Sequence, residues 1–248
     1  MGNYRRLPLE GLANARELGG FPCPEGLTAF GRYLRSEVPA RLSESDFTFF
    51  KEYGLKTVID FRGGEEIAKT ADVLSAQDWI TYIHLPVFDE NVVRGAAKDM
   101  LKDMSADFTW GKHYVQMAEE KKDWVKTVLE TIAASEGVVL FHCTTGKDRT
   151  GIISAVLLGL CGVSESDIAA DYCVSEIYLR DMFKAMSKYV PVDMDIEGSN
   201  PFLSTKWENM VMLLEYISST YGGMAGYVRE CGVAQETVDI IRGRFIEA

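Results

Sequence analysis

The sequence predicts an α/β fold, in which a mainly parallel central sheet is flanked by helices. Two short apolar stretches, 55–61 and 138–141, have the length of buried strands, and each is followed by a segment of helical length. Alternation of this kind is typical of parallel sheets, because each pair of parallel strands needs a crossover connection, usually a helix. With 248 residues, 47% of them hydrophobic, and no internal repeat, we expect residues 1–248 to form one domain.

Turn and capping residues position the elements of the first third of the chain. Residues 9–35 are rich in glycine and proline, which predicts turns joined by short strands. Ser43 and Ser45 both precede an apolar-periodic segment, and one of them is expected to begin a helix through a capping box. The expected elements are a strand at 30–34, this helix ending near Gly54, a strand at 55–61, a helix at 65–75 and a strand at 79–87.

Helices dominate the remainder. A helix over 122–134 leads to the strand at 138–141, and the next apolar run predicts a helix over 152–160. Ser164 and Asp167 form a second capping box, which predicts a helix extending to Lys188. Two more amphipathic helices are expected, at 207–221 and at 235–246.

Residues 92–118 form the least regular part of the sequence, and we expect one or two helices there. Methionine and aromatic residues are mixed with charged ones in this segment. Such a mixture occurs in ordinary core packing, but also on adaptable surfaces that close over a site. Both interpretations stay open: packing against the core, or a helical lid inserted at 92–118.

The net charge of the chain limits the kinds of partner that it can bind. A net charge of −11 argues against nucleic acid, which is bound through clustered lysine and arginine. The chain has no polybasic run for docking on anionic lipid, and its longest apolar run, 151–163, is too short to span a bilayer. We therefore expect no nucleic-acid partner and no stable membrane insertion. An anionic substrate would have to be bound by local positive charge.

The five cysteines are scattered, odd in number and without metal-ligand spacing. This pattern favours a reducing compartment over a disulfide framework, and it predicts no metal site. The N-terminal residues have no apolar segment typical of a secretory signal. A cytoplasmic location is therefore expected, with export without a signal left open, and no motif indicates the oligomeric state.

Residues 138–151 carry the chemistry. A strand that passes at once into a helix leaves the first N–H groups of that helix unpaired, and these groups form an anion site. Cys143 and Arg149 lie in this turn with five residues between them. A thiol at a helix N-terminus beside a cation is readily ionised to a nucleophile. Arg149 can bind two phosphate oxygens side by side.

Other residues of the turn are expected to complete the phosphate site. The backbone amides from Thr144 to Arg149 would supply hydrogen-bond donors, which makes Thr144, Thr145 and Gly146 candidate phosphate-binding residues. Lys147 would be an additional cation for the phosphate. The hydroxyl of Thr150 is expected to donate a hydrogen bond to Cys143 when the sulfur acts as a leaving group.

The turn resembles a known signature. The stretch 142–151, His-Cys-Thr-Thr-Gly-Lys-Asp-Arg-Thr-Gly, matches that of the cysteine-dependent protein tyrosine phosphatases. Its Gly-Lys-Asp-Arg part resembles the bacterial tyrosine and lipid phosphatase branch, which is similar to the eukaryotic phosphoinositide phosphatases. Weaker matches to this branch are Asn-Ala-Arg-Glu-Leu-Gly-Gly at 14–20, Asp-Phe-Arg at 60–62 and the C-terminal segment 222–246. The resemblance therefore extends over most of the chain.

The resemblance implies a two-step reaction without metal or cofactor, in which Cys143 takes the phosphoryl group as phosphocysteine and water then releases phosphate. The implied substrate is phosphotyrosine in proteins, with phosphoserine, phosphothreonine or phosphoinositides as further possibilities. One alternative is a phosphatase of inositol phosphates or other small molecules, for which Lys147 would bind a second anionic group. Another alternative is a catalytically silent phosphate-binding module, against which the intact Cys143 and Arg149 argue.

The general acid has three candidates, because the Trp-Pro-Asp motif of many tyrosine phosphatases is absent. The resemblance favours Asp148, which its place in the turn would put beside the scissile oxygen. Asp89 follows the strand at 79–87 and is the positional substitute for the missing motif. Asp60, near Arg62 at the end of the strand 55–61, is the third candidate. His142 is expected to shape the turn through hydrogen bonds rather than to shuttle protons.

Overall fold

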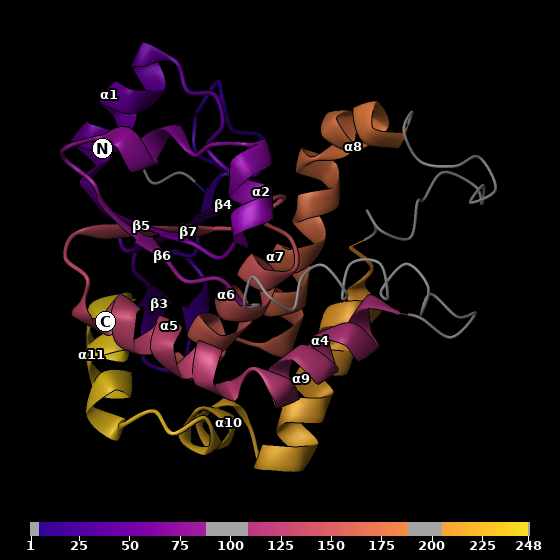
Figure 1. Cartoon of the computed structure of the whole chain (residues 1–248). Helices are drawn as coiled ribbons and strands as arrows, with labels where there is room; N and C mark the ends of the chain where they lie inside the picture. The colour runs from indigo at the N-terminus through magenta and orange to yellow at the C-terminus, as the bar shows by residue number, and fades with distance from the viewer. Residues whose placement is uncertain (1–4, 88–108, 188–204, 248) are drawn as a thin grey trace.

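The computed structural model describes residues 5–87, 109–187 and 205–247. Five strands form its central sheet in the order β1–β4–β7–β5–β6, and all neighbours are parallel except β1 and β4. The predicted fold class, a mainly parallel sheet flanked by helices, is confirmed (Figure 1). The strands of this sheet are β1 (Arg16–Glu17), β4 (Tyr33–Ser36), β5 (Leu55–Asp60), β6 (Thr81–His84) and β7 (Val138–His142).

A second, smaller sheet joins the N-terminal turns to the C-terminus. Its three antiparallel strands lie in the order β2–β3–β8. They are β2 (Pro22–Cys23), β3 (Gly26–Thr28) and β8 (Ile246–Glu247). Within the described residues no helix combines the length and apolarity that crossing a membrane requires.

Strand β7 is the central strand, and it is buried on both faces. Val139 and Phe141 pack with the larger apolar core, whereas Val138 and Leu140 pack with the smaller one. This alternation follows from the two-residue period of a strand. A strand covered on both sides reads as a continuous apolar run, which is why the sequence identified it so clearly.

The helices are divided unequally between the two faces of the sheet. The smaller core lies beneath α1 (Glu44–Tyr53) and the short 3₁₀ helix η1 (Val73–Ala76). The larger core is formed with most of the other helices, and α6 is buried on nearly every side. These helices are α4 (Trp110–Glu120), α5 (Lys122–Ala134), α6 (Arg149–Leu160), α7 (Glu165–Tyr178), α9 (Trp207–Tyr221), α10 (Met224–Glu230) and α11 (Gln235–Phe245).

The first predicted helix has the expected ends. Ser43 is its N-cap, because the Ser43 side chain accepts a hydrogen bond from the Asp46 N–H and the Asp46 carboxylate accepts one from the Ser43 N–H. Gly54 ends the helix in the left-handed conformation, with φ of 89°. This reciprocal capping box gives the boundary that the sequence predicted.

Two predicted helices are broken in the structure. The segment 65–75 divides into α2 (Gly64–Lys69) and η1, because Asp72 caps a new turn by accepting a hydrogen bond from the Leu74 N–H. The segment 164–188 divides at Leu179 into α7 and α8 (Arg180–Ser187). Leu179 is completely buried there, so a tertiary contact accompanies the break.

The segment proposed as a lid is only partly described. Residues 92–108 lie outside the described residues, and so does Asp89. Residues 110–118 belong to α4, which packs against α9. Tyr114 and Met117 are buried, so this part of the segment belongs to the core.

Candidate active site

Residues 143–148 form the turn between β7 and α6, beyond the carboxyl ends of the parallel strands. Ligands of open α/β sheets bind at this edge. Cys143 follows β7 directly and is 1% exposed. Arg149 is the first residue of α6, and its side chain is 17% exposed, so it is not turned out into solvent.

Three hydrogen bonds from residues outside the turn hold its carbonyl groups in place. Because a trans peptide points its N–H away from the preceding C=O, the amides of residues 145–147 face the opposite side of the loop. Among the described residues, the N–H groups of Thr145 and Gly146 have no acceptor, so they are available to an anion. The three anchors are Val38 N–H to Thr144 O at 3.2 Å, Asn14 Nδ2 to Thr145 O at 3.0 Å and Arg35 Nη2 to Gly146 O at 2.7 Å.

Gly146 is required by the path of the loop. Its φ is +69°, in the left-handed region, and a Cβ there would lie 2.2 Å from the carbonyl oxygen of Ser36. A side chain is therefore excluded both by conformation and by contact with backbone. The close approach to Ser36 is what brings the turn against the end of β4.

The guanidinium of Arg149 presents one bidentate edge. Its Nη1 donates to Glu66 Oε2 at 2.6 Å and to the Phe61 carbonyl at 3.3 Å, and its Nη2 donates to Glu66 Oε1 at 2.8 Å. Among the described residues, Nε–H has no acceptor, and the second Nη2 proton has only the hydroxyl of Thr144 at 3.5 Å. Nε–H and this Nη2–H lie on the same edge, which matches two oxygens of a phosphate.

Glu66, on α2, fixes that orientation, and the sequence analysis did not identify it. Burial alone would raise the pKa of Glu66, but hydrogen bonds from Arg149 and the Thr144 hydroxyl lower it to about 2. The carboxylate therefore stays charged beside Arg149. Burial alone would likewise lower the pKa of Arg149, yet interactions with Cys143 and the Glu66 carboxylate raise it.

Asp148 and Lys147 contact each other and helix α4. Lys147 Nζ lies 2.7 Å from Asp148 Oδ1 and 4.0 Å from the centre of the Trp110 ring. The hydroxyl of Tyr114 donates to the same Oδ1 at 2.5 Å. Asp148 is 21% exposed at its side chain, whereas Lys147 is almost fully buried. Asp148 can therefore reach a ligand in the turn, and Lys147 is engaged within the protein.

Thr150 does not make the contact expected of it. Its hydroxyl oxygen is buried and has no hydrogen-bond partner in the described part of the chain. The predicted donation to Cys143 is therefore not made in this structure.

Asp60 and Arg62 belong to a buried structural network. Asp60 accepts hydrogen bonds from Arg62 Nε at 3.0 Å, from Arg62 Nη2 at 2.6 Å and from the Tyr82 hydroxyl at 2.7 Å. Burial alone would raise the pKa of Asp60, but these bonds and the neighbouring His142 lower it. A fully buried, low-pKa carboxylate does not fit a general acid, which must carry a proton to the substrate. Asp60 is thus set aside, leaving Asp148 and the undescribed Asp89.

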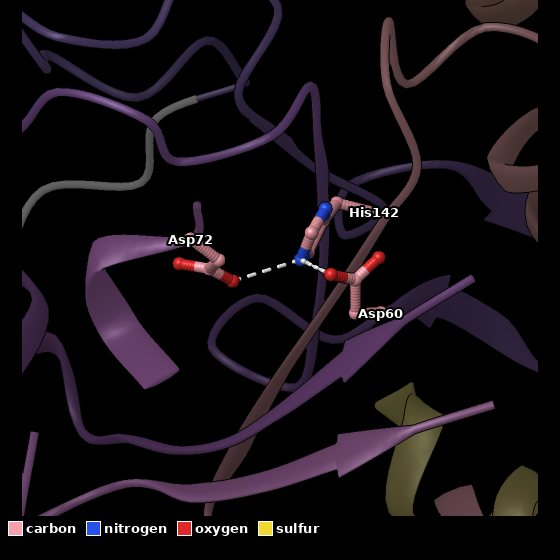
Figure 2. A group of neighbouring side chains, drawn as sticks. All are labelled: Asp60, Asp72 and His142. Atoms are coloured by element: carbon pink, nitrogen blue, oxygen red, sulfur yellow. Dashed lines mark hydrogen bonds and ion pairs between the residues drawn. The ribbon is translucent and has the colours of Figure 1, made fainter. Parts of the chain in front are cut away.

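His142 lies between two carboxylates, and Figure 2 shows its Nε2 directed toward both. The distances are 3.0 Å to Asp72 Oδ2 and 3.8 Å to Asp60 Oδ2, and Nδ1 lies 3.2 Å from the Cys143 carbonyl. His142, Asp60 and Asp72 each offer one possible metal-ligand atom, and these atoms lie within 4.8 Å of one another, close enough to bind one metal ion. The donor set does not fit a metal, because the guanidinium of Arg62 already occupies Asp60 and would repel a second cation. The cluster instead links η1 and β5 to the start of the turn.

A second buried network supports the turn from the opposite side. Asp171 on α7 accepts hydrogen bonds from Arg16 Nε at 2.9 Å and from Arg35 Nη1 at 2.6 Å, and all three side chains are at most 2% exposed. Arg16 also donates to Asn14 Oδ1 at 2.6 Å. Since Arg35 and Asn14 hold two carbonyls of the turn, this network positions the loop. Asn14 and Arg16 belong to the segment 14–20, which resembles the phosphatase branch, so the network gives these two residues a role. Asp171 was not predicted from the sequence.

Comparisons with known proteins identify the relatives of this chain. The sequence model of a family described as "Tyrosine phosphatase family" matches residues 7–247. A tyrosine-protein phosphatase of Nostoc commune is 31% identical over 227 residues, covering 87% of this chain and 74% of the relative. The triple specificity protein phosphatase PtpB of Mycobacterium tuberculosis is 24% identical, covering 86% of this chain and 90% of the relative. The crystal structure of Pseudomonas aeruginosa TpbA is 20% identical, with a TM-score of 0.38, over 65% of this chain and 82% of the other.

Proposed function

The chain belongs to the tyrosine phosphatase family, whose members are phosphoric monoester hydrolases, and from this premise we propose that it dephosphorylates phosphotyrosine in proteins through a phosphocysteine on Cys143. The observation that carries the proposal is the arrangement of the turn. Within residues 143–149 the chain places a buried cysteine, an arginine whose Nε–Nη2 edge pairs with no carboxylate of the described residues, and two loop amides that have no acceptor among them.

In the first step, the Cys143 thiolate attacks phosphorus in line with the leaving oxygen. The sulfur–phosphorus bond forms while the ester phosphorus–oxygen bond breaks, and Asp148 gives its proton to the departing oxygen. Arg149 and the loop amides bind the three equatorial oxygens, whose charge redistributes in the transition state. Holding these donors in place before the reaction avoids the cost of reorganising solvent.

In the second step, water attacks the phosphocysteine. Asp148, now a carboxylate, accepts a proton from this water as its oxygen bonds to phosphorus. The sulfur–phosphorus bond breaks, the electron pair returns to sulfur, and inorganic phosphate leaves. The protein returns to its starting state, with a thiolate at Cys143 and a proton on Asp148.

Among phosphate monoesters, a protein phosphotyrosine is the substrate we favour. Phosphoserine, phosphothreonine and phosphoinositides remain further substrates of the proposed activity, and inositol phosphates are the alternative class. The alternative depended on Lys147 as a clamp for a second anionic group. Lys147 is 1% exposed and forms an ion pair with Asp148. Its burial and this ion pair favour a structural role for Lys147.

The test is a substrate panel of phosphotyrosine peptides, phosphoserine peptides, phosphoinositides and inositol phosphates, assayed with a chelator present. Activity is expected to be highest on phosphotyrosine peptides, independent of added metal and inhibited by vanadate. Cys143→Ser should be inactive, and rapid quenching of the wild-type reaction should trap phosphate on Cys143. Turnover that requires Mg²⁺, or full activity in Cys143→Ser, would refute the mechanism. A clear preference for inositol phosphates would favour the alternative substrate class.

Asp148→Asn tests the proposed acid. This variant should lose about a hundredfold in kcat on phenyl phosphate, a poor leaving group, and much less on 2,4-dinitrophenyl phosphate, which departs without a proton. Asp89→Asn and Asp60→Asn are the comparison variants. If Asp89→Asn alone shows this dependence on the leaving group, Asp89 is the acid.

A further inference from the structure

The two oxygens of the Asp148 carboxyl group have different surroundings. Oδ1 accepts two hydrogen bonds, from the Tyr114 hydroxyl at 2.5 Å and from Lys147 Nζ at 2.7 Å. Among the described residues, Oδ2 has no hydrogen-bond partner. An oxygen that already accepts two donors is a poor site for a proton, because the proton would displace one of them.

Tyr114 is itself oriented by a directional chain. Its hydroxyl has one proton, which it donates to Asp148, so the Tyr172 hydroxyl at 2.8 Å must donate to Tyr114. Asn209 on α9 holds the first turn of α4, because its Oδ1 accepts a hydrogen bond from the Gly111 N–H at 3.1 Å. The donors thus run from Tyr172 on α7 through Tyr114 on α4 to the turn.

We propose that Tyr114 is a positioning residue for the phosphatase reaction, which keeps the transferable proton of Asp148 on Oδ2 and holds that oxygen toward the leaving group. The inference rests on the proposed role of Asp148. When the ester bond breaks, the Oδ2 proton moves to the leaving oxygen, and the new carboxylate charge is stabilised by Tyr114 and Lys147. In the second step a water proton returns to Oδ2.

The place of Tyr114 in the fold suits this role. The side chain is fully buried, and α4 also brings Trp110, one turn earlier on the same helix face, over Lys147. Burial together with the Asp148 carboxylate raises the pKa of Tyr114 well above its ordinary value. The Tyr114 hydroxyl therefore keeps its proton, and remains a hydrogen-bond donor, over the whole pH range near neutrality.

The test is a double-mutant cycle with Tyr114→Phe, Asp148→Asn and the double variant, assayed on phenyl phosphate and on 2,4-dinitrophenyl phosphate. Tyr114→Phe should lower kcat on phenyl phosphate about tenfold, the effect of losing one hydrogen bond to a charged group. It should leave the 2,4-dinitrophenyl substrate and the inhibition constant of vanadate almost unchanged. In the Asp148→Asn background, Tyr114→Phe should have no further effect.

Tyr227→Phe is the matched control, because Tyr227 is also fully buried and its hydroxyl donates to the α4 carbonyl of Ala118 at 2.9 Å. It should change the stability but not the dependence on the leaving group. Equal losses on both substrates in Tyr114→Phe, or a further loss in the Asp148→Asn background, would overturn the inference. If Asp148→Asn discriminates between the substrates and Tyr114→Phe does not, the inference fails while the acid stands. If Asp148→Asn itself does not discriminate, the assignment of the acid fails first.

Discussion

Glu66 and Arg149 are joined by two parallel hydrogen bonds, although one lies on α2 and the other begins α6. The pair uses the Nη1–Nη2 edge of the guanidinium and leaves the Nε–Nη2 edge to a ligand. A fork–fork pair of this kind fixes the plane of the guanidinium as well as its position. The orientation of the phosphate-binding arginine therefore depends on a helix more than 80 residues earlier in the chain.

The first prediction concerns this pair. Glu66→Gln should weaken vanadate binding and lower kcat/KM by about tenfold each, because an amide offers only one acceptor and turns an N–H toward the guanidinium. Inhibition by vanadate and steady-state kinetics measure the two effects. Glu65→Gln, an exposed neighbour on the same helix, is the control and should behave as wild type. Unchanged vanadate binding in Glu66→Gln would mean that Arg149 is oriented by other contacts.

The second prediction distinguishes two effects of replacing a glycine, the strain of a positive φ and the steric clash of an added Cβ. Gly146 and Gly31 have nearly the same positive φ, +69° and +67°, but a Cβ at Gly31 would meet nothing within 4 Å. Gly31→Ala should therefore cost about 1–2 kcal/mol of unfolding free energy, the left-handed strain alone, and leave activity intact. Gly146→Ala adds a clash with the Ser36 carbonyl, which only a shift of the loop relieves. It should lose most activity, and similar kinetics in the two variants would contradict this account.

The third prediction concerns the buried carboxylate of Asp171. Asp171→Asn removes the carboxylate that pairs with Arg16 and Arg35, so the unfolding free energy should fall by about 3–5 kcal/mol in urea titrations. Vanadate affinity should fall too, because Arg35 holds the Gly146 carbonyl. Glu165→Gln, exposed on the same helix, should change stability by only a few tenths of a kcal/mol. A stable Asp171→Asn with weak vanadate binding would show that the network orients the loop without stabilising the fold.

What the sequence could predict was set by local pattern. Strand β7 and helix α6 were found because both are continuous apolar runs, and the turn between them because glycine and the chemistry-bearing residues occur together. Glu66 and Asp171 were not predicted as site residues, because a charged residue on a helix is expected to face solvent unless its ion-pair partner is known. Those partners lie 83 and 155 residues away in the chain, and only the fold brings them together.

The break in the predicted helix 65–75 comes from side-chain contacts. The sequence predicts one helix through 70–72, but Arg62 Nη1 donates to the Thr70 carbonyl and Asp72 caps the next turn. A hydrogen bond from a nearby arginine side chain and a local cap thus interrupt the helix. From the sequence, Asp60 was the third candidate for the general acid, behind Asp148 and Asp89. Its hydrogen bonds with Arg62 and Tyr82 depend on side-chain packing, which the sequence does not show.

The last prediction concerns stability and pH. Glu17 in β1 is fully buried; its Oε1 accepts hydrogen bonds from Tyr53 and from the Gly31 N–H, and its Oε2 has no partner in the described part of the chain. Burial raises the pKa of Glu17 from 4.5 to about 7, although the two hydrogen bonds oppose the shift. The folded state thus binds this proton more tightly than the unfolded state does.

The sign follows from this difference. The stabilisation by the Glu17 proton is complete below about pH 4.5, declines as the pH rises and is lost above about pH 7, up to a total of about 3 kcal/mol. Glu17→Gln resembles the protonated acid at every pH, so in urea titrations it should match the wild type at pH 4 and exceed its stability at pH 8. Glu52→Gln, an exposed change nearby on α1, should leave the pH dependence as it is. If Glu17→Gln is less stable than the wild type at pH 8, the Glu17 carboxylate is accommodated in its charged form, and the stability of the phosphatase near neutral pH has another origin.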